Sequence, residues 1–183
     1  MTEQDMAGIP NDGALTPVIR AVSDGDREAL RGMFRRLSPR TIYLRFHTPY
    51  PSVPGWMLDL MIDVDHRDRE SLVAVAGGEI VGHAMYVREN GGEAEVAVVV
   101  EDRWQSKGVG KLLLSDLARE ANRRGLGTFT GLALGENRRV LDLISAVFAE
   151  VGYAIRDGHY VIRVPLRTLK PVATTTRKIR HAA

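Results

Sequence analysis

The chain has 183 residues, of which 44% are apolar and 26% charged, and this length favours a single domain with one hydrophobic core. It contains no cysteine, which excludes disulfide bonds, thiolate metal sites and a cysteine nucleophile. The net charge of +2 is too small to indicate a nucleic-acid partner by itself.

The first segment, residues 1–16, is expected to be a disordered lead. It carries acidic residues where a signal peptide needs positive charge, and it lacks the apolar run that such peptides contain. Apolar runs elsewhere in the chain are too short to span a membrane. The sequence therefore predicts a cytoplasmic protein that does not bind a membrane.

A short strand over residues 18–22 precedes three predicted helices. The first covers residues 24–37, where Ser23 and two acids suit a helix N-terminus. The second starts at Ser38-Pro39, with serine at the cap and proline at the first helical position. Three prolines make residues 47–54 a loop, and residues 55–62 form the third helix.

Glycine turns and apolar runs define the predicted sheet. Its next strands cover residues 71–76, 79–87, 96–100 and 128–134. Gly77-Gly78 joins the first two of them as a hairpin. A helix starting at Val109 connects the last two, and a right-handed crossover of this kind makes the flanking strands parallel.

The last third of the domain repeats these patterns. A helix is expected from residue 138 to about Glu150, followed by a hairpin over residues 154–166 that turns at Asp157-Gly158. Residues 167–183 carry basic residues without acids and are expected to form a basic flexible tail. No aromatic residue is interleaved there for base stacking, so nucleic acid is not the expected partner.

The stretch from Gln105 to Gly110 lies where a strand passes into a helix. The first N–H groups of a helix lack intrahelical partners and carry partial positive charge, so they can bind a phosphate. Gly108 and Gly110 let an anion approach the backbone, and Gln105 and Lys107 can add side-chain donors. The alternative is an ordinary strand-to-helix turn, since the spacing fits neither the Walker nor the Rossmann motif.

The pattern V-x-V-x-x-x-x-Q-x-x-G-x-G resembles the acetyl-CoA signature of the GNAT superfamily of N-acetyltransferases. Its defined positions are Val98, Val100, Gln105, Gly108 and Gly110. The resemblance implies an α/β fold over residues 17–166, with a mixed, mostly antiparallel sheet, a central parallel strand pair splayed around acetyl-CoA, and helices on both faces. It implies acetyl-CoA as cosubstrate and no metal.

The same resemblance implies the cofactor-binding residues. The CoA pyrophosphate would be bound by Gln105, Ser106, Lys107, Gly108, Val109, Gly110 and Lys111. Val98 and Val100 would lend backbone groups to the pantetheine arm. Asn137 matches an asparagine that bonds the cofactor or a water, although it is also a good helix N-cap.

Four short segments extend the likeness to the GNAT domain of bacterial Pat-type protein lysine acetyltransferases. They are residues 38–39, 43–46, 63–65 and 94–97. In that group the glutamate matching Glu95 is the general base, so Glu95 is the catalytic candidate, expected deep in the cleft. The alternative is a solvated glutamate alternating outward with Glu93.

The chain departs from the family where a tyrosine often protonates the leaving thiolate. Counting along the helix after Asn137 reaches Ile144 or Phe148, and neither can donate a proton. His66 and His83 are lone histidines, for which a structural role is expected before a catalytic one.

The favoured function is direct transfer of acetyl to a primary amine, with protein lysine as acceptor. Two alternatives stay open. One is an enzyme for small amines such as a polyamine, an amino sugar or an aminoglycoside, and the other is a CoA-binding regulatory module without catalysis. The expected assembly is a monomer or a homodimer.

Overall fold

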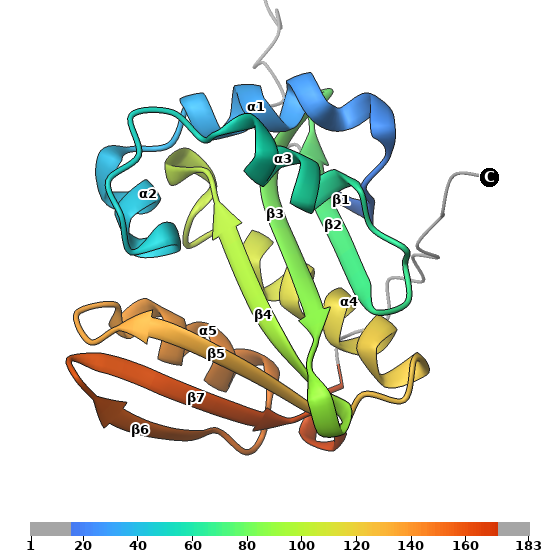
Figure 1. Cartoon of the computed structure of the whole chain (residues 1–183), viewed down its shortest axis with the longest axis vertical. Coiled ribbons are helices and arrows are strands. Elements are labelled where there is room, and N and C mark those ends of the chain that lie inside the picture. Colours follow the sequence, from blue (N-terminus) through green and yellow to red (C-terminus); the bar gives the residue numbers. More distant parts are fainter. Residues whose placement is uncertain (1–15, 172–183) are drawn as a thin grey trace, which may run out of the picture.

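A seven-stranded sheet with the strand order β1-β2-β3-β4-β5-β7-β6 runs through the computed structural model of the chain (Figure 1), which describes residues 16–171. The strands are β1 (Val18–Ala21), β2 (Arg69–Ala76), β3 (Glu79–Arg88), β4 (Glu93–Val100), β5 (Thr128–Leu134), β6 (Gly152–Arg156) and β7 (His159–Pro165). Neighbours are antiparallel except for β4 and β5, which are parallel. This confirms the predicted mixed, mostly antiparallel α/β fold.

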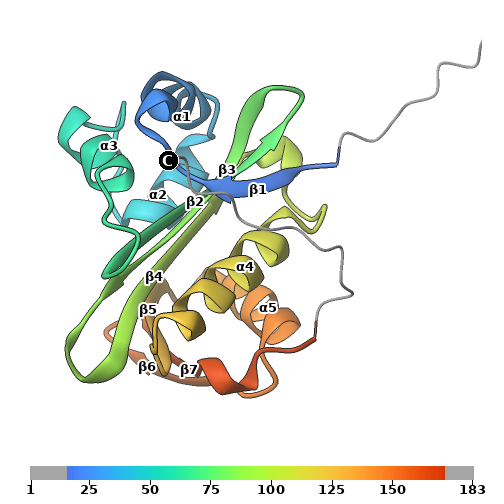
Figure 2. The same ribbon diagram turned by 90° about the vertical axis from the view of Figure 1, so that its right-hand side faces the viewer.

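Helices cover both faces of the sheet, as predicted (Figure 2). One face, called the front face below, carries α1 (Arg27–Arg35), α2 (Pro39–Phe46) and α3 (Gly55–Ile62). The back face carries α4 (Val109–Arg123) and α5 (Arg138–Val147). Short 3-10 turns are formed by Asp24–Asp26, Asn90–Gly92, Asp102–Trp104 and Leu166–Thr168.

The parallel strand pair is joined over a short distance. Glu93, Ala94 and Glu95 of β4 pair with Thr128, Phe129 and Thr130 of β5. Beyond that point β4 stays paired with β3 up to Val100, while β5 stays paired with β7 up to Leu134. The sheet therefore opens as a fork, with its vertex at Glu95 and Thr130 (Figure 1).

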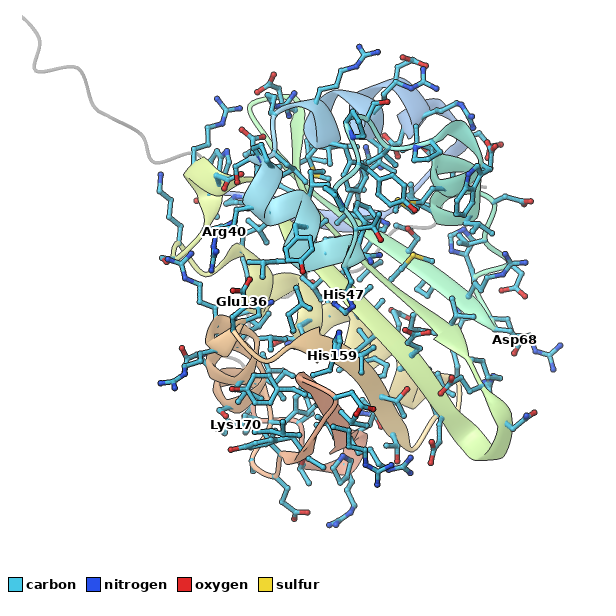
Figure 3. The ribbon with its side chains drawn as sticks, turned by 60° about the vertical axis from the view of Figure 1, so that its left-hand side comes forward. Arg40, His47, Asp68, Glu136, His159 and Lys170 are labelled. Carbon is cyan, nitrogen blue, oxygen red and sulfur yellow. The ribbon has the colours of Figure 1, made fainter. Side chains whose placement is uncertain are left out.

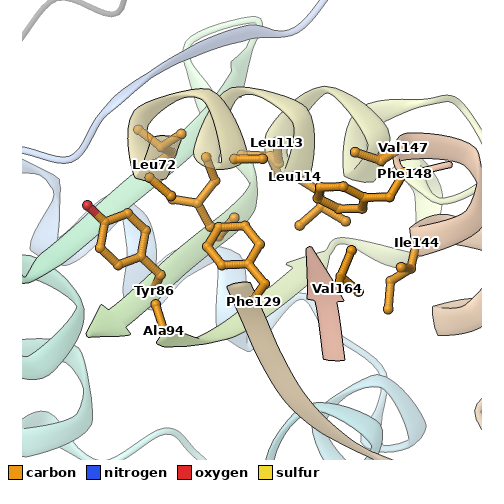
Figure 4. Close-up of a cluster of buried hydrophobic side chains, with 14 of the residues drawn as sticks. Leu72, Tyr86, Ala94, Leu113, Leu114, Phe129, Ile144, Val147, Phe148 and Val164 are labelled. Atoms are coloured by element: carbon orange, nitrogen blue, oxygen red, sulfur yellow. The ribbon is translucent and has the colours of Figure 1, made fainter. Parts of the chain in front are cut away.

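The back-face core fixes α4 against the sheet (Figure 4). The helix buries one stripe that includes Leu113, Leu117 and Ala121, each fully shielded from solvent. Gly82 of β3 allows the close approach, because a Cβ there would lie 2.9 Å from Leu113 Cδ1 and 3.3 Å from the Val99 carbonyl oxygen. This packing sets where the N-terminus of α4 lies relative to β4.

Two expectations for the end of the chain differ from the structure. The helix expected to reach Glu150 ends at Val147, because Phe148 is extended (φ −115°, ψ 150°) and forms a bridge with Leu169. Residues 167–170, expected to belong to the flexible tail, instead pack against the domain, since the Lys170 N–H bonds the Val147 carbonyl at 2.8 Å. The basic residues around Leu169 suggested a solvated segment, whereas Leu169 packs against the back-face core. The expectations for residues 1–15 and 172–183 lie outside the described residues.

Candidate active site

The N-terminus of α4 opens beside the fork. Gly108 occupies the N-cap position with φ +82°, a left-handed conformation that favours glycine. Leu112 closes the first helical turn by bonding the Gly108 carbonyl at 3.0 Å, while the preceding loop residues Ser106 and Lys107 are exposed. The first-turn N–H groups and the positive end of the helix dipole are thus directed to a surface that an anion can reach.

The backbone of β4 presents alternate residues to the two sides of the strand. Glu101 donates its N–H to the Val81 carbonyl at 2.9 Å, and Glu93 accepts from the Glu89 N–H at 2.7 Å, so odd-numbered residues face β3. Val98 and Val100 consequently direct their backbone groups to the side from which β5 has diverged. Both predicted pantetheine contacts therefore lie along the open edge of the fork.

The side chain of Gln105 connects three elements. Its Nε2 donates to the Val100 carbonyl at 3.1 Å and to Thr41 Oγ1 at 3.3 Å, and its Oε1 accepts from Arg139 Nη1 at 2.9 Å. We expected this side chain to donate to a bound anion. Instead its amide links α2, the end of β4 and the start of α5, so it shapes the loop from within the protein.

A cluster around Asp102 positions α2, and the sequence did not reveal it. The carboxylate accepts from the Ser38 N–H at 2.9 Å, the Ser38 hydroxyl at 2.7 Å and the Thr41 hydroxyl at 2.8 Å. Burial acts to raise the pKa of Asp102, but these hydrogen bonds outweigh it and hold the pKa below its ordinary value. Ser38 also caps α2 through the Thr41 N–H, as predicted. The cluster ties the start of α2 to the segment that leads into the glycine loop, residues 105–110.

Glu95 lies at the vertex of the fork on the front face. Its backbone pairs with Val87 on one side and with Thr130 on the other. The side chain is exposed rather than deep in the cleft, which corrects the expectation from the sequence. Neighbouring Glu93 differs in its bonding, since Arg163 Nη1 donates to Glu93 Oε2 at 2.8 Å. Glu95 is thus a carboxylate that a large acceptor can reach from the front.

Helix α2 spans the front of the fork and meets the β5–β7 half of the sheet (Figure 3). At one end Arg40 lies 3.9 Å from the Glu136 carboxylate, and at the other the rings of His47 and His159 have centroids 5.4 Å apart. Burial, followed by the charges of His159 and Arg45, lowers the pKa of His47. The two halves of the sheet are therefore connected across the fork by α2 as well as at its vertex.

Asn137 occupies the N-cap position of α5 without a side-chain capping bond. Its N–H bonds the Leu134 carbonyl at 2.8 Å, which places the residue directly after β5 at the open end of the fork. Ile144 and Phe148, the positions reached by counting for the family's tyrosine, are buried in the back-face core.

Comparisons with known proteins agree with this arrangement. The profile of the acetyltransferase (GNAT) family matches residues 31–144, more than half of the chain. The chain belongs to this family. The matched residues include α2, Glu95, the fork, the glycine loop and most of α5, so the resemblance noticed in the sequence is confirmed.

Two curated relatives extend the likeness of this GNAT domain to named acetyltransferases. Acetyltransferase Pat of Mycolicibacterium smegmatis is 31% identical over 137 residues, which cover 71% of this chain and 41% of that protein. An acetyltransferase of Pseudomonas aeruginosa is 30% identical over 135 residues, covering 71% of this chain and 73% of its own length. The chain thus spans less than half the length of the Pat relative.

Solved structures show the same fold. The GNAT domain of S. lividans PAT superposes with a TM-score of 0.76 at 28% identity, covering 81% of this chain and 90% of that one. The structure of yncA from Salmonella typhimurium, which contains its cofactor acetyl-CoA, superposes with a TM-score of 0.67 at 19% identity, covering 87% and 97%.

The two histidines singled out in the sequence of this GNAT domain, His66 and His83, have structural partners. His83 is fully buried, with its Nε2 2.8 Å from the Ser71 hydroxyl, and burial and the charge of Arg45 lower its pKa to about 3. It therefore stays neutral at physiological pH and is a poor base. His66 pairs with the buried Glu70 at 2.8 Å.

Within residues 16–171 there is no cluster of three or more His, Asp or Glu side chains that could hold a metal ion. Among the helices of that same range, none has the length and apolar character needed to cross a membrane.

Proposed function

We propose that this GNAT domain transfers acetyl from acetyl-CoA directly to a primary amine, with lysine side chains of proteins as the acceptor class. The observation that carries the proposal is the position of Glu95. Its exposed carboxylate lies at the vertex of the fork, and the backbone edge of Val98 begins a few residues further along the same strand. The likeness to Pat, although it covers part of that protein, supports a protein acceptor.

The residues around the fork fit acetyl-CoA, which supplies an acetyl group as a thioester when it is bound. Backbone groups of Val98 and Val100 on the open edge of β4 would bond the pantetheine amides. The N–H groups of the loop and of the first turn of α4, from Ser106 to Lys111, would bind the pyrophosphate. Asn137 has a side chain not used for capping and would add a polar contact from the β5 side.

Exposure of Glu95 favours a macromolecular acceptor. A lysine on a protein surface extends from a large body, so the group that receives its amine must be reachable from an open face. The exposed apolar side chains of Val87 and Leu132 lie near Glu95 on the front face and can pack against the aliphatic part of a lysine.

The amine must become neutral before it attacks. A lysine with a pKa of about 10.4 is neutral in about one molecule in 2,500 at pH 7, which costs about 4.6 kcal/mol. In the proposed reaction the amine nitrogen bonds the acetyl carbonyl carbon, the C–S bond breaks, and Glu95 accepts the proton that the nitrogen gives up, directly or through water.

The leaving sulfur receives its proton from solvent in this proposal. Ile144 and Phe148 have no proton to donate and are buried behind the sheet. If the CoA thiol has a pKa near that of cysteine, about 8.5, its thiolate can leave without a protein acid and then take a proton from water.

The experiment is incubation of the purified protein with acetyl-CoA and a panel of lysine-bearing proteins, polyamines, amino sugars and aminoglycosides. Free thiol release and acceptor mass are measured together. Acetylated lysine in the proteins supports the proposal, and a preference for a small amine selects the first alternative. Binding of acetyl-CoA without transfer to any acceptor would identify a regulatory module and reject the proposal.

A further inference from the structure

Strand β6 is an edge strand whose outer side has no partner among residues 16–171. It is the last strand in the sheet order, and within that range only β7 pairs with it. All five of its residues are exposed, and Figure 1 shows the strand at the outer margin of the sheet. The strand contains no proline, lysine or acidic residue, the residue types that keep an exposed edge from pairing with another chain. Its free side is therefore a template for a further strand.

The turn after β6 shows which backbone groups point to the free side. The dipeptide Asp157-Gly158 has positive φ at both positions, 48° and 76°, and joins Arg156 to His159 as a two-residue hairpin turn. In such a turn the carbonyl of the residue before it accepts from the N–H of the residue after it, so Arg156 directs its backbone groups to β7. Because this direction alternates along a strand, Tyr153 and Ile155 direct their N–H and carbonyl groups outward.

The residues with outward backbone groups also carry exposed apolar side chains. Tyr153 is 55% exposed and Ile155 is 67% exposed. Both project to the back face, because they pair with Ile162 and Tyr160 of the back-face core. The Tyr153 ring packs edge-on against the Tyr160 ring, with centroids 5.5 Å apart. The edge thus combines free backbone donors and acceptors with an apolar strip.

The sequence of β6 is complementary to a second copy of itself. When two β6 strands are paired antiparallel about a twofold axis at Ala154, Tyr153 of each copy lies opposite Ile155 of the other. Aromatic and β-branched residues in such opposite positions stabilise a sheet. Arg156 lies opposite Gly152, so no like charges meet. The outward backbone groups bond across the two Tyr153–Ile155 pairs, and the two Ala154 residues occupy the non-hydrogen-bonded position between them.

We propose that β6 is a homodimer interface, at which two copies of the chain pair their β6 strands antiparallel about a twofold axis at Ala154 and join their sheets into one. Directly opposite residues of an antiparallel pair project to the same side, so the front faces of the two copies lie on one side of the dimer. Both Glu95 carboxylates then face the same way, and one acceptor protein with several lysines can meet two sites. The pairing itself does not depend on the proposed acetyl transfer.

Sedimentation velocity of the full chain tests the association. A five-residue strand forms a small interface, so the wild type should pass from monomer to dimer between about 5 and about 500 µM. Ile155→Lys places a charge on the edge, opposite Tyr153 of the second copy, and should raise the dimer Kd at least about tenfold. Val18→Lys is the matched control, since Val18 is an apolar residue, 48% exposed, on β1, the other edge strand. It should associate like the wild type.

A cysteine scan tests the register of the pairing. The chain contains no cysteine, so each single variant carries one thiol. Ala154→Cys should form a disulfide-linked dimer under mild oxidation, because Cα atoms at that position lie about 4.5 Å apart, within the range that a disulfide spans. Tyr153→Cys and Ile155→Cys place their thiols diagonally across the axis, with Cα atoms about 7–8 Å apart, and should crosslink much less.

The outcomes that overturn the proposal are distinct. One is a monomer at every concentration, and another is a dimer that Val18→Lys weakens while Ile155→Lys does not. A crosslinking maximum at Tyr153 or Ile155 would show a different register. A monomer whose Tyr153 and Ile155 amides slow in exchange only when a lysine peptide is added would assign the edge to the acceptor instead. Because none of these measurements uses acetyl transfer, failure of the dimer and failure of the proposed function remain distinguishable.

Discussion

Glu95 and Thr130 form the last residue pair that joins β4 to β5. Beyond them the two strands have separate neighbours, β3 and β7, so the carboxylate of Glu95 marks the point where the sheet divides. Thr130 itself is bonded elsewhere, since its hydroxyl donates to Glu89 Oε2 at 3.0 Å. The Thr130 hydroxyl therefore donates its hydrogen bond to Glu89 and not to Glu95.

Replacing Glu95 by glutamine should separate binding from chemistry. Glutamine keeps the shape of the side chain but cannot accept a proton at neutral pH, so turnover should fall by about a hundredfold or more while acetyl-CoA affinity is kept. Steady-state kinetics and calorimetry measure the two effects. Glu93→Gln is the matched control on the same strand. It removes the exposed ion pair with Arg163, which contributes little to stability, so its turnover should stay near that of the wild type. Equal rates for Glu95→Gln and wild type would leave Glu95 as a spectator.

The glycine loop predicts a selective loss of cofactor binding. A Cβ on Gly110 would lie 3.5 Å from Leu143 and 3.6 Å from Val100, which are ordinary contact distances, so Gly110→Val should still fold. Because Gly110 lies in the first turn of α4, the added side chain stands beside the N–H groups of that turn, and the Kd for acetyl-CoA should rise at least about tenfold, or ~1.4 kcal/mol. Gly25→Val is the control, because nothing lies within 4 Å of a Cβ there. Unchanged affinity in Gly110→Val would argue against the pyrophosphate site.

The pair of Arg20 and Asp26 predicts an acid-sensitive part of the stability. Arg20 Nη1 and Nη2 donate to the Asp26 carboxylate at 2.6 and 2.7 Å, and Ser23 donates through its N–H and its hydroxyl. The bond from Arg20 is the main cause that lowers the pKa of Asp26, against burial, which raises it. Because Arg20 is partly exposed, we expect Asp26→Asn to lower the free energy of unfolding by about 1–3 kcal/mol.

The pH dependence of that difference follows from the direction of the shift. A carboxyl with a lowered folded-state pKa contributes stability above its unfolded pKa of about 3.9, and that contribution is lost as the pH falls through the folded value. The gap between wild type and Asp26→Asn should be constant above about pH 5 and should close below pH 4. Urea unfolding at several pH values measures it. Asp59→Asn, which breaks an exposed pair with Arg27, should leave stability unchanged.

The contacts of residues 167–170 with the domain predict which C-terminal truncation lowers its stability. A chain that ends at Leu166 loses the Phe148–Leu169 bridge, the Lys170 N–H bond to Val147 and the Lys170 Nζ bond to the Ser145 carbonyl at 2.6 Å. We expect a loss of about 2–3 kcal/mol, or roughly 4–10 °C in Tm. A chain that ends at Pro171 keeps these contacts and should melt like the full chain. Equal melting of both truncations would show that the docked segment contributes nothing.

Local patterns in the sequence sufficed for most elements of the fold. The helix over residues 55–62 and the strand over residues 128–134 have the predicted bounds, since Pro54 precedes the helix and Gly127 and Gly135 flank the strand. The turns at Gly77-Gly78 and Asp157-Gly158 have the positive φ values that such dipeptides favour. The parallel pair followed from the crossover rule for a strand, a helix and a strand.

The features that the sequence did not reveal depend on contacts between distant residues. Asp102 binds Ser38 and Thr41, more than 60 positions away, and Leu169 reaches Phe148 only after the last strand has returned. The position of Glu95 at the vertex depends on where β4 and β5 part, which is set by contacts between distant strands. The family signature identifies the loop, but it carries no information on these contacts.

The one-sided pairing of β4 beyond Glu95 has a consequence for amide hydrogen exchange. Ala97 and Val99 direct their N–H groups to β3, whereas Val98 and Val100 direct theirs to the open side of the fork. One strand thus alternates between amides that are held in the sheet and amides that can exchange with water. The contrast between neighbouring residues makes Val98 a built-in reporter, whose amide slows when a ligand occupies the fork while Ala97 beside it serves as the internal standard.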